Sequence, residues 1–146
     1  MHSRHCCGLL SDQNASIMTI QRHFTHTPWE PKVGYCRALR AGSIIYLSGT
    51  APIDDSGHTF APGDAHAQAL RCFEIIRDTL RAMDADLHQV IRTRMYVIDI
   101  SQWEAFGKAH QSFFGDHPPV TTMIEVKGLI NPDMLIEIEA EAFVGS

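Results

Sequence analysis

Two segments near the C-terminal end of the chain alternate apolar and polar residues with a period of two. In residues 135–143 the polar positions are Glu137, Glu139 and Glu141, and apolar side chains occupy the positions between them. Residues 118–126 alternate in the same way. This pattern is typical of strands with one dry and one polar face. We therefore expect two strands here, with a row of carboxylates that is costly to desolvate if another subunit covers it.

Two further segments have the spacing of amphipathic helices. Asp64 is a suitable N-cap, and the apolar residues after it recur at spacings of three and four, which predicts a helix that ends near residue 85. Ser101 and Glu104 form a capping-box pattern that predicts the start of a second helix, and Gly115 predicts its end. The inner face of the second helix is expected to carry Trp103, Phe106, His110 and Phe113.

Four more segments are rich in strand-forming residues and lie between turn residues: 20–24, 35–40, 44–48 and 90–98. Residues 29–34 and 50–63 carry proline and glycine and are predicted to be loops. The resulting order is β-β-β-α-β-α-β-β. It predicts an α+β fold with a six-stranded, mainly antiparallel sheet and two helices on one face. The other face of the sheet then meets water or another chain.

The composition favours one soluble globular domain. The chain has 146 residues, of which 45% are hydrophobic and 20% charged, typical of a single domain that needs no disulfide or metal for its stability. A net charge of −5 opposes binding to nucleic acids and to anionic membranes, because both carry negative charge. We expect residues 1–18 to be a disordered N-terminal tail and residues 19–146 to form the domain.

No apolar run is long enough to span a bilayer or to form the core of a signal peptide. We therefore expect a cytoplasmic protein with reduced cysteines, in which Cys36 and Cys72 are small buried residues. The nine histidines are scattered, without the three or four convergent ligands that a zinc ion requires. Neither a metal nor another cofactor is expected.

An ordered set of short segments resembles one known family. The segments are Gly34-Tyr35, Ile45 to Pro52, Arg92 to Asp99, Phe113-Phe114, Pro119 and Ile136 to Ala140. Together they resemble the RidA/YjgF reactive-intermediate deaminases, also called endoribonuclease L-PSP, over about residues 20–143. The resemblance implies a chorismate-mutase-like fold and a homotrimer with three clefts between neighbouring subunits. It also implies cofactor-free hydrolysis of imines and enamines to ketoacids and ammonia.

Several site residues of the family have a counterpart in this chain. Tyr35 matches the tyrosine of the cleft, and Glu137 matches the glutamate that positions a water molecule. Ser48 and Gly49 match the strand end whose backbone contacts the carboxylate of the ligand. The resemblance therefore implies that Glu137 is the catalytic residue, since a partly buried carboxylate can hold a water and accept its proton.

Other positions depart from the family pattern. Thr121 stands where the deaminases have an arginine that clamps the substrate carboxylate, and Met123 replaces a cysteine beside it. A threonine offers one neutral hydroxyl instead of two charge-assisted bonds, so binding of a small 2-imino acid should weaken by roughly ten- to a hundredfold or more. Arg94 and Arg37 are candidate substitute cations, and each is alternatively a surface ion-pair residue.

Three functions remain open on the sequence. The leading hypothesis is a homotrimeric imine or enamine hydrolase with altered specificity, acting on a small metabolite. The second is a non-catalytic metabolite-binding or chaperone-like trimer, which the loss of the arginine favours. The third is the ribonuclease that the older family name implies, and the acidic balance of the chain opposes it.

Overall fold

The computed structural model describes residues 19–145, so the predicted tail, residues 1–18, lies outside the described part. This part of the chain forms six strands, three α-helices and two short 3-10 turns at Leu87–Gln89 and Ile100–Gln102. The strands are β1 (Ile20–His23), β2 (Ala38–Ala41), β3 (Ile44–Thr50), β4 (Val90–Val97), β5 (Val120–Glu125) and β6 (Ile136–Phe143). The helices are α1 (Trp29–Val33), α2 (Ala65–Ala82) and α3 (Trp103–Phe114).

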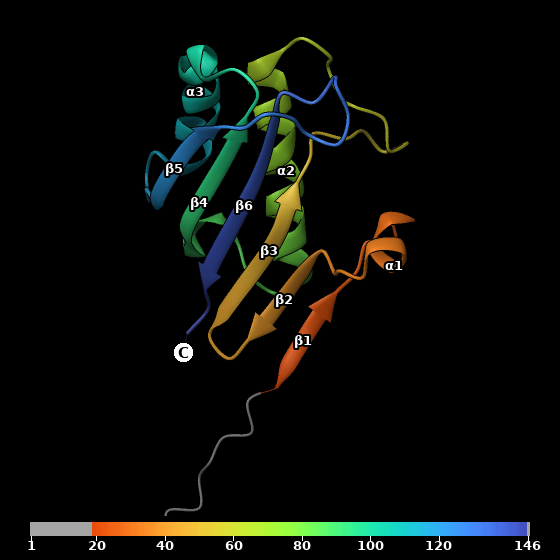
Figure 1. The fold of residues 1–146 in the computed structure, drawn as a ribbon. Helices are drawn as coiled ribbons and strands as arrows, with labels where there is room; N and C mark the ends of the chain where they lie inside the picture. The colour runs from red at the N-terminus through yellow and green to blue at the C-terminus, as the bar shows by residue number, and fades with distance from the viewer. Residues whose placement is uncertain (1–18, 146) are drawn as a thin grey trace, which may run out of the picture.

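The six strands form one sheet in the order β1-β2-β3-β6-β4-β5, as Figure 1 shows. All neighbouring pairs are antiparallel except β4 and β5, which are parallel. A parallel pair needs a crossover, and α3 supplies it. The predicted α+β class with a mainly antiparallel sheet is therefore confirmed.

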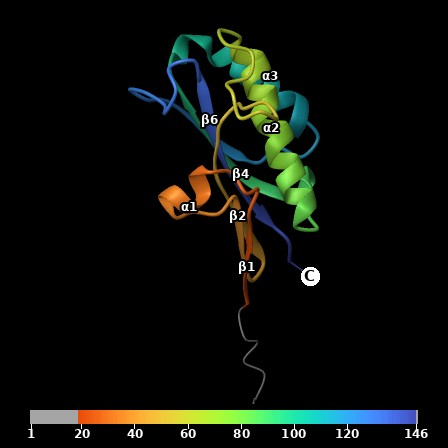
Figure 2. The ribbon, with the colours of Figure 1, turned by 90° about the vertical axis from the view of Figure 1, so that its right-hand side faces the viewer.

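Helices α2 and α3 lie together on one face of the sheet, whereas α1 lies on the other side (Figure 2). The core between α2, α3 and the sheet is apolar and fully enclosed. Among its largest members are Phe73, Ile76, Leu80, Phe106, Phe114, Ile136 and Ile138. The predicted N-cap of α2 is confirmed, because the Asp64 carboxylate accepts the Ala67 N–H at 2.9 Å. Neither this helix nor any other within residues 19–145 is long and apolar enough to cross a membrane.

The segment 29–34, predicted to be a loop, instead contains helix α1. A helix of five residues is too short to show a periodic pattern, so the proline and glycine of this segment dominated the prediction. Glu30 holds the turn in place: its buried carboxylate accepts the Thr25 N–H and hydroxyl and the His26 N–H. Gly34, at φ 87°, ends the helix in a left-handed conformation that glycine adopts without strain.

Two predicted helix and strand starts are wrong by a few residues. Asp99, not Ser101, caps the turn before α3, because its carboxylate accepts both the Ser101 N–H and the Ser101 hydroxyl. Trp103, predicted on the inner face, is 56% exposed at the first position of α3, and Phe114 is buried instead. Strand β2 begins at Ala38, so Tyr35 precedes the strand and does not lie in it.

Candidate functional site

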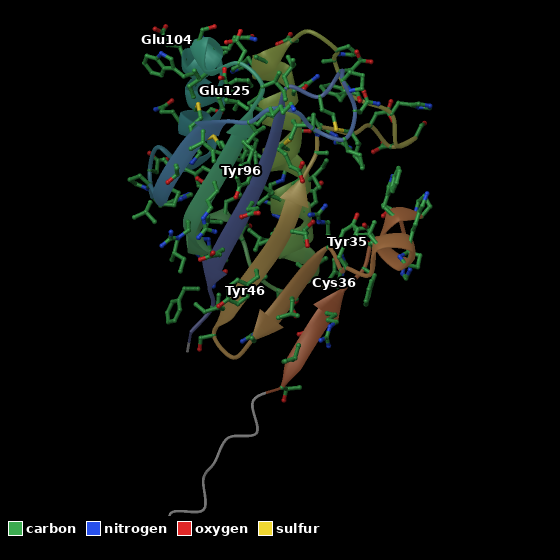
Figure 3. The ribbon with its side chains drawn as sticks, in the orientation of Figure 1. Tyr35, Cys36, Tyr46, Tyr96, Glu104 and Glu125 are labelled. Carbon is green, nitrogen blue, oxygen red and sulfur yellow. The ribbon has the colours of Figure 1, made fainter. Side chains whose placement is uncertain are left out.

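The predicted row of carboxylates lies on the face of the sheet that α2 and α3 leave uncovered, here called the open face. Along β6 the residues at 136, 138, 140 and 142 are buried, while Glu137, Glu139 and Glu141 are half-buried on the opposite side. Tyr46 and Tyr96 lie on the same open face, since they pair with Glu141 and Glu137 in the sheet register. Figure 3 shows both tyrosines on the side turned toward the viewer.

The carboxylate of Glu137 rests directly on the backbone of Gly49. A Cβ atom placed on Gly49 would lie 2.1 Å from Glu137 Oε1, which is closer than any real contact. Glycine is therefore required for this approach. Gly49 belongs to a β-bulge: Leu47 pairs with Ala140 and Thr50 with Ile138, so two residues of β3 face one residue of β6. The bulge brings the β3 backbone under the Glu137 side chain.

Arg37 fixes the backbone of this bulge. Its Nη2 atom donates to the Ser48 carbonyl oxygen at 2.5 Å and to the Gly49 carbonyl oxygen at 2.8 Å. The Ser48 hydroxyl donates to the Cys36 carbonyl oxygen at 2.7 Å and ties the bulge to the segment before β2. A charged donor that bonds two successive carbonyls holds the strand end rigid. The structure thus brings Ser48, Gly49 and Glu137 together, and Arg37, one of the two candidate cations, lies beside them.

Burial and two neighbouring charges set the pKa of the Glu137 carboxyl. Burial raises the pKa of the Glu137 carboxyl, the positive charge of Arg37 lowers it, and Glu139 raises it again, with a net rise above the ordinary value. A carboxyl with a raised pKa is a better base once ionised, which suits a residue that takes a proton from water.

A cavity of about 890 Å³ lies beside the bulge, between α1 and the open face of β2 and β3. Ser48 and Tyr35 line it, together with Tyr46 and Leu39 of the sheet and Glu30 of α1. The labelled Tyr35 in Figure 3 lies near α1, where the chain enters β2. Cys36 also lines this cavity and is only partly buried, in contrast to Cys72, which is fully buried as predicted.

Thr121 and Met123 lie on the opposite side of the sheet from Glu137. Thr121 pairs with Thr93 in the register, and the buried Thr93 hydroxyl donates to Thr121 Oγ1 at 2.7 Å. Side chains alternate between the two faces along β4, so Thr93 faces the helices and Tyr96, three positions later, faces away from them. Met123 packs against the core on the same helix side.

The predicted site residues therefore form two groups in one chain. We call Tyr35, Arg37, Ser48, Gly49 and Glu137 the open-face half of the site. We call Thr93, His110, Thr121 and Met123 the helix-face half, with His110 of α3 included because its Nε2 lies 2.8 Å from Thr93 Oγ1. The sheet separates the two halves, so they cannot contact one ligand within a single chain.

Arg94, predicted as a substitute cation, is occupied by other partners. Its guanidinium donates to Glu141 at 3.0 Å and lies 3.5 Å from Glu139. These contacts correspond to the ion-pair role that the sequence left open for this residue. Arg37 is the arginine that adjoins Glu137, Ser48 and Gly49, so it is the better-placed of the two cations.

Comparison with known proteins decides the family. The family model described as Endoribonuclease L-PSP matches residues 25–144. The chain belongs to the endoribonuclease L-PSP family, which includes the RidA/YjgF proteins. The 3-aminoacrylate deaminase RutC of Acinetobacter baylyi is 31% identical over 114 residues, which cover 78% of this chain and 90% of that protein. A RutC family protein of Pyrococcus horikoshii is 31% identical over 120 residues, which cover 82% and 94%.

Solved structures of the RidA/YjgF family have the same fold. A Mycobacterium tuberculosis member of the YjgF/YER057c/UK114 family is 38% identical, with a TM-score of 0.78, and the match covers 86% of this chain and all 100% of that one. The YjgF gene product of Escherichia coli is 26% identical, with a TM-score of 0.69, and the match covers 75% and 87% of the two chains.

Sequence reasoning missed two members of the site in this RidA/YjgF chain. From the sequence, Thr93 looks like an ordinary threonine of a strand, and His110 was predicted only as a residue on the inner face of the second helix. The available signal was that Thr93 shares a strand face with Ile91, Met95 and Val97, where a hydroxyl needs a partner. Over residues 19–145 no group of three or more histidine, cysteine or acidic side chains could hold a metal ion.

Proposed function

We propose that the protein is a cofactor-free hydrolase of imines or enamines that acts in the cytoplasm, in clefts between the subunits of a homotrimer. The observation that carries this proposal is the placement of Glu137. Its half-buried carboxylate rests on the bare backbone of Gly49, and the half-buried cation Arg37 lowers its pKa. Ser48 of the same bulge lines the cavity. A carboxylate held this way has one oxygen against the backbone and can hold a water molecule with the other.

The reaction needs few groups. Glu137 accepts a proton from the bound water while the water oxygen attacks the electrophilic carbon of the protonated imine. The new C–O bond gives a carbinolamine, and the proton held by Glu137 passes to its nitrogen. Glu137, again ionised, takes the proton of the new hydroxyl as the C–N bond breaks, so a carbonyl compound and ammonia form, and the proton then passes to the ammonia or to solvent. A positioned general base contributes roughly 10²–10⁴ to the rate of such a step.

A second copy of the chain is needed to complete the cleft. Thr121 and Met123 lie across the sheet from Glu137, so only a neighbouring subunit can bring a helix-face half to the open-face half. The open face also exposes large apolar side chains, among them Tyr46, Val120 and Ile124. Exposed apolar area of this kind favours burial against a partner, and closed cyclic symmetry gives three equivalent contacts in a trimer.

The substrate is proposed to differ from a small 2-imino acid. The position that carries a clamping arginine in the deaminases carries Thr121 here, and Thr121 is bonded to Thr93 and not to any charged group in the described structure. The relative named a 3-aminoacrylate deaminase supports the reaction class but does not fix the substrate of this chain.

The test is ammonia release from a panel of imines generated by amino-acid oxidases. We expect release by the wild-type protein and a loss of roughly 10²–10⁴-fold in Glu137→Ala, because the base is removed. Glu139→Ala is the matched control, since the same side-chain change is made on the same strand face, two residues away. Equal rates in Glu137→Ala and wild type would refute the proposal. Ligand-induced stabilisation without turnover would favour the metabolite-binding trimer instead.

A further inference from the structure

A continuous chain of hydrogen-bonding groups runs from the helix layer to the clamp position. It begins at His110 of α3, whose Nε2 lies 2.8 Å from the Thr93 hydroxyl oxygen, and continues from the Thr93 hydroxyl to Thr121 Oγ1 at 2.7 Å. Thr93 is fully buried at the centre of this chain, whereas Thr121 lies on the edge strand and is exposed. The polar chain therefore connects the interior with the surface of the helix-face half.

The hydrogens of this chain can be assigned by counting. A threonine hydroxyl has one hydrogen, and the Thr93 hydrogen is donated to Thr121. Thr93 then has no second hydrogen for His110, so this arrangement requires the His110 tautomer that carries a hydrogen on Nε2. Thr121 Oγ1 has accepted one bond from Thr93, and its own hydrogen is free to point away from the sheet. The chain thus presents an oriented O–H donor at its exposed end.

The chain carries no net charge at neutral pH. His110 packs edge-on against the ring of Phe73 at 5.5 Å and tilted against the ring of Phe114 at 4.7 Å. This burial lowers the pKa of the His110 imidazole below its ordinary value. The clamp position is therefore neutral. The open-face half that would meet it contains the carboxylate of Glu137 and the guanidinium of Arg37, and Nη2 of Arg37 is already bonded to the carbonyl oxygens of Ser48 and Gly49.

We propose that Thr93 and His110 are positioning residues that make Thr121 a neutral hydrogen-bond donor, and that the ligand presents an uncharged acceptor there, such as an amide or ester carbonyl. This inference rests on the proposed function, because it needs the helix-face half to meet Glu137 in one cleft. A ligand carboxylate at this place would be desolvated beside Glu137 with no positive charge from the Thr121 chain. A neutral carbonyl avoids that repulsion and still accepts the Thr121 hydrogen.

Binding of two product analogues separates the alternatives. Pyruvate and pyruvamide have the same size and differ in the charge of one group. We expect pyruvamide to bind the wild-type trimer more tightly than pyruvate, as measured by calorimetry at fixed ionic strength. Thr121→Val and Thr93→Val should each weaken pyruvamide binding by about three- to tenfold, the worth of one neutral hydrogen bond, with less than about a twofold change for pyruvate.

The control is Ser112→Ala, which removes a hydroxyl from α3 that donates to Ala109 and has no link to the chain. It should leave both affinities unchanged. A purely structural role for Thr93 would weaken both ligands equally in Thr93→Val, and that result would overturn the inference. So would tighter binding of pyruvate than of pyruvamide, or no binding of pyruvamide at millimolar concentration. Intact pyruvamide preference without ammonia release from any imine would refute only the hydrolase proposal.

Discussion

The two halves of the candidate site are built from opposite kinds of side chain. The open-face half holds a carboxylate and a guanidinium, Glu137 and Arg37, which bracket the bulge at Gly49. The helix-face half holds only hydroxyls, an imidazole and a thioether, and its polar atoms bond to one another. A single sheet carries both halves on opposite faces. In the proposed function, one face supplies proton transfer and the other supplies recognition of an uncharged group.

The largest expected effect tests whether the two halves meet across subunits. Glu137→Ala removes the base from the open-face half, and Thr121→Trp blocks the helix-face half, so each variant alone should be inactive. Co-expressed in equal amounts, random trimers contain clefts with both native halves in about a quarter of cases, because each half is native with a probability of about one half. We expect about a quarter of the wild-type rate of ammonia release.

The matched control places both substitutions on one chain and mixes it with Glu137→Ala. No cleft then contains a native Glu137, so this mixture should remain inactive. If the first mixture is as inactive as its components, although scattering shows mixed trimers, the composite site is refuted.

The second prediction separates the two faces by stability. Ile138 is buried under α2 and α3, whereas Glu139, its neighbour on β6, is half-buried on the open face. Ile138→Ala should reduce the free energy of unfolding by about 2–5 kcal/mol, since a large buried side chain leaves a cavity. Glu139→Ala should have a much smaller effect, because partly exposed ion pairs contribute little. Urea unfolding with unchanged slope measures both, and similar losses would contradict the assignment of faces.

The sequence was sufficient to predict which residues of β6 face the core and which face away from it. It was not sufficient to predict which site residues share a face of the sheet. The alternation along 135–143 placed the three glutamates opposite the buried residues, as the structure confirms. The pairing of Thr121 with Thr93 depends on which strand neighbours β5, and the parallel β4–β5 pair is a long-range choice that local patterns do not encode. The bulge at Ser48 and Gly49 shifts the register between β3 and β6. Gly49 is a residue type that favours bulges, but the predicted strand ended at Ser48, before this glycine.

The short helix α1 and the role of Arg37 could not be predicted from the sequence either. Helix α1 depends on the bonds of Glu30 to Thr25 and His26, and Arg37 depends on carbonyls of the next strand, and a periodic pattern of apolar residues encodes neither. Arg37 reaches carbonyls 11 and 12 residues away, and its value to the site is visible only when β2 and β3 lie side by side. The sequence offered Arg37 and Arg94 as equal alternatives, and three-dimensional placement separates them.

The third prediction concerns the contact between Gly49 and Glu137. Gly49→Ala would place a methyl group 2.1 Å from Glu137 Oε1, so the carboxylate must move. The contacted atom is the end of a flexible side chain, and the fold can adjust at little cost. We expect the melting temperature to change little and kcat/KM to fall by about 10–100-fold, the typical result of misplacing a catalytic group by about 1 Å. Gly107→Ala is the control, since nothing lies within 4 Å of a Cβ placed there.

The smallest expected effect tests whether the charge of Arg37 influences the pKa of Glu137. In the proposed mechanism the reaction requires ionised Glu137, so the rate should rise with pH through the pKa of that carboxyl. Arg37 lowers this pKa against the opposing effects of burial and Glu139. Arg37→Gln keeps a hydrogen-bond donor near the Ser48 and Gly49 carbonyls but removes the charge, so the rising limb of the pH–rate profile should move to higher pH. The rate on the plateau above that limb should change less than in Gly49→Ala.

Arg94→Gln is the comparison for this variant, because within residues 19–145 Arg94 pairs with Glu141 and Glu139 and forms no ion pair with Glu137. Its pH–rate profile should move less than that of Arg37→Gln. If both variants kept the wild-type profile, the charge of Arg37 would have no influence on the base, and the open-face half would act through geometry alone. If Arg94→Gln moved it further, Arg94 would be the cation that matters to Glu137, as the sequence first allowed.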